Sequence, residues 1–255
     1  FRSRMNTKKL AELIYSVAQY DGYNTSILQT QKNLSTNKDE WQFTNETDRY
    51  IFEDLVKAIH YASQQKKLTV DVFKGINAQM DSHKEGQPEN PGKLREKVTI
   101  HVGDYVPPRT VTEKMVQREL DAVTENSVED GWALYARLAK LQAFDNGNKR
   151  TALISANLFI GSLTGESSTY LTIPTDFRRT QFDANLMYYY MADDFDDHMP
   201  DVQYSLNEFV RFAKEYTETQ PKNKFEERLV EAKEKQKNHT SMTESEIAKN
   251  KGKTL

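Results

Sequence analysis

Apolar residues at helical spacing on both sides of one short polar loop constrain the fold of this chain most strongly. Before the loop, apolar side chains recur every few residues, at Trp132, Leu134, Tyr135, Leu138 and Leu141. After the loop they recur at Leu153, Ile154, Leu158 and Phe159. Such spacing places apolar side chains on one face of an α-helix. The pattern therefore predicts two core helices joined by residues 142–150.

The same periodicity continues through most of the chain and predicts a mainly α protein, a bundle of about seven to nine helices. The first predicted helix, residues 10–20, ends at Asp21-Gly22, and a polar connection follows to about Asn45. Further helices are expected at residues 50–59, 69–80, 112–120, 177–191 and 206–216. Residues 82–92, which are rich in Gly, Pro and Asn, are expected to form a loop.

One β-branched run, Val98-Thr99-Ile100-His101-Val102, is the best strand candidate. Gly103-Asp104 follows as a turn signal, and Pro107-Pro108 cannot continue a central strand. We therefore expect a small β-hairpin flap here.

Composition excludes several classes of protein. The 255 residues carry a net charge of −3, which argues against a general nucleic-acid surface. There is no cysteine, so disulfides and thiolate metal sites are excluded. No apolar run approaches the roughly 20 residues that cross a bilayer. We expect a cytoplasmic protein with neither a nucleic-acid nor a membrane partner.

The distribution of charge predicts three segments. Residues 1–45 would form an N-terminal helix and a polar connection, with a regulatory role as one expectation. Residues 46–220 would form the core domain. Residues 221–255, in which charge rises sharply and only a narrow apolar stripe remains, would form a surface helix and a tail.

The loop itself has the chemistry of an anion site. It lies at a predicted helix start, where free backbone N–H groups and the positive end of the helix dipole favour negative charge. Gly147 permits backbone conformations closed to other residues, and Lys149 and Arg150 add cations that suit phosphate. We expect the backbone around Asn146, Gly147 and Asn148 to bind phosphate together with these two side chains.

The loop also resembles the signature of the Fic/Doc (Fido) family, HxFx(D/E)GN(G/K)R. Phe144, Gly147, Asn148, Lys149 and Arg150 fall in register with it, and Lys149 matches the Doc-like branch. The resemblance implies a Fic-fold bundle in which Phe144 anchors the loop in the core. It also implies that the flap residues Thr99, Ile100, His101 and Val102 dock a target segment.

Three positions depart from the family pattern. The family's histidine, which takes the proton from a target hydroxyl, is replaced by Gln142, and a carboxamide cannot act as that base. The family's acidic Mg²⁺ ligand is replaced by Asn146, which would hold the metal only weakly. The second arginine that steadies the γ-phosphate in adenylylating members is replaced by Leu153.

The resemblance thus implies an ATP-binding protein that descends from protein adenylyltransferases. Its AMP transfer to a Ser, Thr or Tyr hydroxyl of a target protein would be weak or absent. Doc-like phosphotransfer by a toxin with a small antitoxin partner, and a regulatory pseudoenzyme without catalysis, remain as alternatives.

An inhibitory helix in many Fic proteins carries the motif (S/T)xxxE(G/N). Ser16 to Gly22 comes nearest to it, but its acid, Asp21, lies one position too late. The segment reads either as a degenerate remnant of that motif or as a plain helix end stopped by glycine.

Overall fold

The computed structural model describes residues 5–97 and 102–220, and residues 228, 229, 232, 233, 235–237 and 239. Residues 1–217 form one compact unit and residues 218–255 a second. In the second unit, the described residues from 228 on are helical and exposed, whereas Thr219 and Gln220 lie outside any helix. The N-terminal helices belong to the first unit, which carries the site.

The described residues are mainly helical, as the periodicity predicts, and contain nine α-helices. These are α1 (Thr7–Ala18), α2 (Ile27–Leu34), α3 (Glu46–Ser63), α4 (Val70–Ala78), α5 (Glu113–Asp121), α6 (Val128–Leu141), α7 (Asn148–Phe159), α8 (Arg178–Met191) and α9 (Val202–Glu218). Two short 3₁₀ helices, η1 (Gln19–Asp21) and η2 (Lys38–Glu40), lie between them.

Side-chain caps explain where most of these helices begin. An Asn, Ser or Thr precedes the first residue and accepts a hydrogen bond from a backbone N–H of the first turn, which otherwise lacks an acceptor. The capping residues are Asn6, Ser26, Asn45, Thr69, Thr112 and Ser127. The helix that begins at the site, α7, instead has Gly147 at its N-cap and no side-chain cap.

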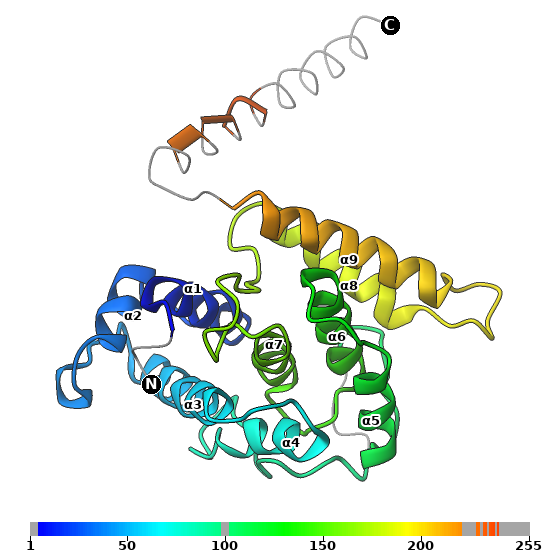
Figure 1. The fold of residues 1–255 in the computed structure, drawn as a ribbon, viewed down its shortest axis with the longest axis horizontal. Helices are drawn as coiled ribbons and strands as arrows, with labels where there is room; N and C mark the ends of the chain where they lie inside the picture. The colour runs from blue at the N-terminus through cyan, green and yellow to red at the C-terminus, as the bar shows by residue number, and fades with distance from the viewer. Residues whose placement is uncertain are drawn as a thin grey trace, which may run out of the picture. The chain divides into compact units, whose positions relative to one another are not determined.

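Helix α7 lies at the centre of the unit (Figure 1). It packs against α6, α3, α4 and α1. Nearly all of its residues are buried, including the polar Thr151, Ser155 and Asn157. A helix buried on all sides is held rigidly, so the loop at its N-terminus has a fixed position.

An aromatic cluster joins α6 to the last two helices. Trp132 and Tyr135 of α6 contact Phe182 of α8 and Phe209 of α9, with ring centroids 5.1–6.3 Å apart. The Trp132 indole N–H donates to Thr217 Oγ1 at 2.8 Å. The cluster fixes α6, and with it the end of α6 that enters the site loop.

Helix α2 was not expected, because its sequence reads as part of a polar connection. Its buried positions are Thr30, Asn33 and Leu34, so polar residues form much of its inner face. They are satisfied locally: Thr30 Oγ1 contacts the Tyr23 hydroxyl at 2.7 Å, and Asn33 Nδ2 donates to Gln42 O at 2.9 Å. Because two of the three buried residues of α2 are polar, the periodicity of apolar residues does not predict this helix.

The expected β-hairpin flap is not shown, because the described residues contain no strand and residues 98–101 lie outside them. One antiparallel bridge joins Val102 to Tyr105 across the Gly103-Asp104 turn. Residues 98–101, and with them Thr99, Ile100 and His101, lie outside the described residues. What remains of the prediction is the tight turn itself, with Gly103 at φ +58°.

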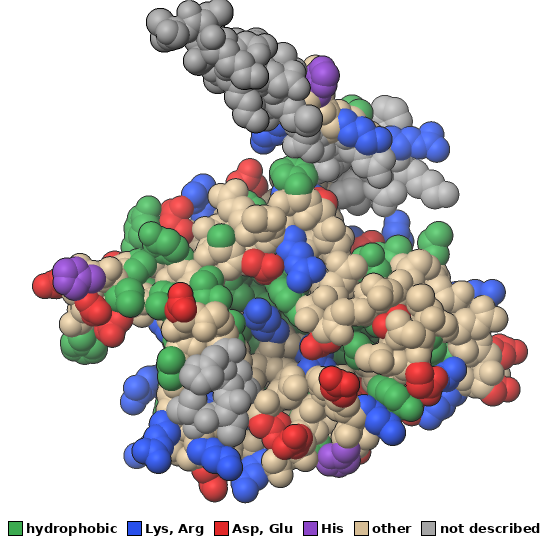
Figure 2. All heavy atoms as spheres, turned by 180° about the vertical axis from the view of Figure 1, so that it is seen from behind, with side chains coloured by type: hydrophobic (Ala, Val, Ile, Leu, Met, Phe, Trp, Pro, Cys, Tyr) green, Lys and Arg blue, Asp and Glu red, His purple; other side chains and the backbone are tan. Residues whose placement is uncertain are grey.

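The surface of the first unit mixes both signs of charge, in keeping with the small net charge (Figure 2). Hydrophobic side chains gather with acidic ones on the lobe at the α8–α9 connection (Figure 2). Four large apolar or aromatic residues are exposed in that region, Tyr188, Phe195, Met199 and Tyr204.

Candidate functional site

The site loop joins α6 to α7 and passes twice through left-handed backbone. Gln142, the C-cap of α6, has φ +45°, and Gly147, the N-cap of α7, has φ +77°. Space also restricts position 147, where a Cβ atom would lie 3.0 Å from Met80 Cε and 3.2 Å from Asn77 Nδ2. The positive φ thus favours glycine at this position, and a Cβ there would require the Met80 and Asn77 side chains to shift.

The side chain of Asn148 determines the shape of the loop. Its Oδ1 accepts from the Phe144 N–H at 2.8 Å, and its Nδ2 donates to Phe144 O at 2.9 Å and to Gln142 Oε1 at 3.2 Å. The Phe144 ring is fully buried and packs against Phe73, with centroids 5.1 Å apart. The Asn148 side chain thus holds the Phe144 backbone and the Gln142 side chain in place within the loop.

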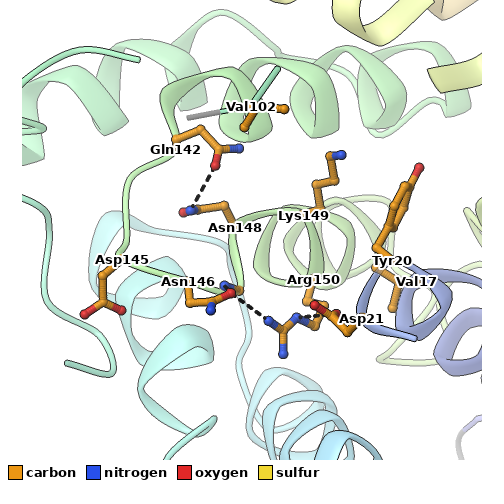
Figure 3. Close-up of a pocket in the computed structure, with 11 residues that line it drawn as sticks. Val17, Tyr20, Asp21, Val102, Gln142, Asp145, Asn146, Asn148, Lys149 and Arg150 are labelled. Atoms are coloured by element: carbon orange, nitrogen blue, oxygen red, sulfur yellow. Dashed lines mark hydrogen bonds and ion pairs between the residues drawn. The ribbon is translucent and has the colours of Figure 1, made fainter. Parts of the chain in front are cut away.

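Gln142, at the position of the family's histidine, is only 4% exposed. Its Nε2 donates to Ala139 O at 2.8 Å, while its Oε1 accepts from Asn148 (Figure 3). One end of the carboxamide thus caps the C-terminus of α6, and the other end holds Asn148 at the start of α7. A carboxamide has no site that takes a proton near neutral pH. The structure therefore gives Gln142 a capping role and no capacity as a base.

Arg150 is held by the protein from several directions and is 3% exposed. Its Nη1 donates to Gln87 Oε1 at 2.7 Å, and its Nη2 to Gly86 O at 2.8 Å and Asn146 Oδ1 at 3.0 Å. Its Nε forms an ion pair with Asp21 Oδ2 at 3.2 Å (Figure 3). Because the Arg150 guanidinium already makes four contacts with the protein, its main contribution to the site is its positive charge and not hydrogen-bond donors for a ligand.

Asp21 lies at the junction of α1 with the site. It closes η1, and Gly22 follows it in the left-handed conformation, φ +80°. Burial raises the pKa of Asp21, and the positive charges of Arg150 and Lys149 oppose that rise. The segment is thus a helix end stopped by glycine and, at the same time, the source of the carboxylate that pairs with Arg150.

Asn146 does not fit a Mg²⁺ ion as it is placed. Its Oδ1 already accepts from the Gly147 N–H at 2.8 Å and from Arg150, whose positive charge would repel a metal ion. The neighbouring Asp145 receives the backbone and side-chain N–H groups of Asn90 on its Oδ2, at 2.9 and 3.0 Å. The described residues contain no group of three or more acidic or His side chains that could hold a metal ion.

Lys149 extends along one wall of the site, beside Tyr20 (Figure 3). Its Nζ lies 4.4 Å from the centre of the Tyr20 ring, and the Arg179 guanidinium carbon lies at the same distance. The Tyr20 hydroxyl donates to Asp183, which also pairs with Arg179. Burial lowers the pKa of Lys149, opposed by the negative charge of Asp183. Lys149 is the cation of the loop whose amino group no ion pair holds within the described part of the chain.

These residues line a cavity of about 380 Å³, at the lower end of the roughly 300–1,000 Å³ typical of small-molecule pockets. Its lining residues are Val17, Tyr20, Asp21, Val102, Gln142 and the run Asp145–Arg150. The first backbone hydrogen bond of α7 runs from Thr151 N to Gly147 O, so the N–H groups of residues 148–150 have no acceptor within the helix. Cavity, helix terminus and Lys149 together have the features of an anion site.

Sequence reasoning found the loop side of this cavity and missed the opposite wall. It named Gln142, Asn146, Gly147, Asn148, Lys149 and Arg150, and Val102 from the expected flap. It gave no role to Val17, Tyr20 or Gln87, which no motif marks. Asp21 was marked by the degenerate motif at Ser16–Gly22, but the sequence did not predict that its carboxylate would pair with Arg150.

No helix among the described residues is both long and apolar enough to cross a membrane.

Part of this chain matches a known protein family. Residues 67–160, which include α4 to α7 and the site loop, match the family described as Fic/DOC. No curated protein sequence matches the chain.

Two solved structures share the fold. A Fic domain containing signaling protein from Bacteroides thetaiotaomicron superposes with a TM-score of 0.60 at 14% identity, covering 85% of both chains. A fragment of Fic-1 from C. elegans superposes with a TM-score of 0.56 at 15% identity, covering 92% of this chain and 66% of that one. At such identities the likeness shows the fold alone.

Proposed function

Because this chain is a Fic-fold protein whose residues 67–160 match the Fic/DOC family, we propose that it binds ATP and descends from protein adenylyltransferases. In the reaction of such enzymes, a Ser, Thr or Tyr oxygen of a target protein bonds to the α-phosphorus of ATP. The bond from that phosphorus to the β-phosphate oxygen breaks, pyrophosphate leaves, and the hydroxyl proton passes to a base. We propose that this chain performs that transfer weakly or not at all.

The cavity supports the nucleotide part of the proposal. The N–H groups at the start of α7 and the Lys149 amino group can donate to phosphate oxygens, and donors of this kind stabilise the charge that develops during phosphoryl or nucleotidyl transfer. Arg150 adds positive charge from behind the loop, where Asp21, Gln87 and Gly86 hold it.

The observation that carries the loss of activity is the side chain of Gln142. It is bonded at both ends, to Ala139 O and to Asn148, and it has no group that can take the target proton. Removal of a general base typically lowers a rate by about 10²–10⁴. No step is assigned to Mg²⁺, because Asn146 Oδ1 is occupied by two N–H donors.

Two other functions are each favoured by a particular observation. Lys149 and the fully buried Leu153, which replaces the second arginine, favour Doc-like transfer of the γ-phosphate, with a small antitoxin as partner. The internal bonds of Gln142 and Arg150 favour a regulatory pseudoenzyme that binds a nucleotide or a partner protein without catalysis. In the catalytic cases the partner is a protein that presents a hydroxyl.

One assay separates these functions. The protein is incubated with cell lysate and with ATP labelled at either the α- or the γ-phosphate, and labelled proteins are separated on a gel. The same assay is run on Gln142→His, with the exposed Gln203→His as the matched control. We expect α-label transfer by Gln142→His to exceed that of the parent and of the control by at least about 10².

Calorimetric titration with ATP completes the test. Transfer of γ-label alone would favour the Doc-like function. Binding of ATP without transfer by either protein would favour the pseudoenzyme. If the parent, Gln142→His and Gln203→His all fail to bind ATP and to transfer label, the nucleotide proposal is wrong.

A further inference from the structure

The described residues contain a second buried arginine, Arg95, to which neither the sequence motif nor the proposed function gives a role. It is 4% exposed and lies in the irregular segment between α4 and α5. Within the described part of the chain, no carboxylate lies at ion-pair distance from it, and burial lowers its pKa. A buried cation without a counter-charge is costly unless hydrogen bonds satisfy its donors.

Backbone carbonyls satisfy those donors. The Arg95 Nε donates to Gln142 O, and Nη2 donates to Leu141 O at 3.3 Å. Nη2 also donates to Pro108 O at 3.0 Å, and Nη1 to Lys97 O at 3.0 Å. One guanidinium thus joins the end of α6 to two points on the segment that carries Val102. The rigid fork of five N–H groups suits arginine to such a junction, which the single ammonium of lysine cannot reproduce.

The backbone of Arg95 makes the same connection. Its N–H donates to Ala143 O in the site loop at 2.9 Å, and its carbonyl accepts from the Val111 N–H at 3.0 Å. Side chain and backbone therefore both connect the site loop with the residues around 108–111. A substitution that removes the guanidinium leaves the two backbone bonds of residue 95 in place. Such a variant would therefore weaken the connection between the site loop and residues 108–111 without abolishing it.

The carbonyl groups at the end of α6, from Ala139 to Gln142, each accept a hydrogen bond from a side chain. Orphan carbonyls at a helix C-terminus need donors from elsewhere. Lys140 O accepts from the Tyr105 hydroxyl at 2.6 Å, and Ala139 O accepts from Gln142 Nε2. Leu141 O and Gln142 O accept from Arg95. The negative end of the α6 dipole also favours a cation at this point.

Val102 connects the contacts at the end of α6 to the lining of the cavity. It lines the cavity beside Gln142 (Figure 3) and is bridged to Tyr105 through Val102 N–Tyr105 O at 3.2 Å and Tyr105 N–Val102 O at 3.0 Å. Tyr105 is in turn tied to α6 through Lys140 O. The position of this part of the cavity wall relative to the site loop therefore depends on the contacts at the end of α6.

We propose that Arg95 is a positioning residue: its guanidinium holds Lys97 and Pro108 against the end of α6 and thereby sets the wall that Val102 gives to the cavity. Arg95 does not line the cavity at the start of α7. Its influence on ligand affinity rests on the proposed function, whereas its influence on the order of residues 102–111 does not.

Hydrogen–deuterium exchange on the full chain tests the proposal, with Arg95→Met, Arg95→Lys and the exposed Arg109→Met as matched control. We expect Arg95→Met to speed exchange of the amides of residues 102–111 at least tenfold, while amides of α3 and α9 keep their rates. Arg95→Lys should give the same local increase, because it restores the charge without the fork. Arg109→Met should change neither region.

Titration with ATP provides the second measurement. Arg95→Met and Arg95→Lys are expected to weaken binding at least tenfold, and Arg109→Met less than twofold. Unchanged exchange at 102–111, an equal increase in α3 and α9, or wild-type exchange in Arg95→Lys would each overturn the proposal. If Arg95→Met does not fold, Arg95→Lys decides by the same criteria. If the parent protein itself binds no ATP, the proposed function falls while exchange still decides the role of Arg95.

Discussion

Arg150 and Asp21 form an ion pair, with Nε and Oδ2 3.2 Å apart, between the first helical segment of the chain and the helix that begins at the site. The arginine belongs to the matched family segment and the aspartate lies outside it. The pair links the charge of the site loop to a residue that the loop sequence does not contain.

Removal of that carboxylate is expected to change both stability and binding. Asp21→Asn leaves Arg150 buried with a weaker partner, which costs up to roughly 3–5 kcal/mol in a fully buried pair. Asp21 is 22% exposed, so we expect a loss of about 1–3 kcal/mol in urea denaturation. The freed positive charge should strengthen binding of inorganic phosphate. Glu208→Gln, which breaks the exposed pair with Arg211, serves as control and should leave the urea midpoint unchanged, because water screens an exposed pair.

Lys149 offers a cleaner probe of anion binding than Arg150, because Arg150 also holds the fold together. Lys149→Met keeps most of the apolar length of the side chain and removes its charge. We expect phosphate and ATP to bind about tenfold more weakly, near the 1.4 kcal/mol expected for one charge-assisted contact. Calorimetry with the exposed Lys66→Met as control measures this. Equal affinities in the two variants would remove Lys149 from the site.

Two glycines with the same backbone conformation allow crowding to be separated from strain. Gly22 and Gly147 have φ of +80° and +77°, but a Cβ at Gly22 meets nothing within 4 Å, whereas one at Gly147 meets Met80 and Asn77. Alanine at either position should cost about 1 kcal/mol for the left-handed backbone. Gly147→Ala should cost at least about 1 kcal/mol more. Equal midpoints in urea for the two variants would mean that the neighbours of Gly147 yield without cost.

Asp54 on α3 should make stability depend on pH. Its side chain is 1% exposed, it accepts from Ser82 Oγ at 2.6 Å, and burial raises its pKa from 3.8. A carboxyl with a higher pKa in the folded state binds its proton more tightly when folded. Its contribution to the free energy of unfolding therefore falls as pH rises from 3.8 through the folded pKa.

Asp54→Asn cannot ionise, so its stability relative to the parent should increase as the pH rises from 3.8 towards neutrality. Urea denaturation across that interval, with the exposed Asp39→Asn as control, measures the difference. A difference that stays constant, or that changes in the opposite direction, would contradict the role of burial.

The sequence predicted the helices whose apolar residues share one face, such as α6 and α7, because burial of that face determines where such helices form. It did not predict α2, whose inner face contains Thr30 and Asn33. It located the loop through Gly147 and Asn148, since their conformation and bonds are local. It did not identify Tyr20, Gln87 or Arg95, because their roles arise from contacts between distant segments. No periodicity or motif records that Arg95 meets the carbonyls of Leu141 and Pro108.

The pairing of Arg150 with Asp21 has a practical consequence for work on this protein. A fragment cut to residues 67–160 would retain the whole site loop, yet it would lose the counter-charge of Arg150 and the α1 and α3 surfaces that cover α7. The site loop is therefore not structurally independent of the rest of the unit. A fragment or graft that contains the site loop should therefore also include the first helical segment, up to Asp21.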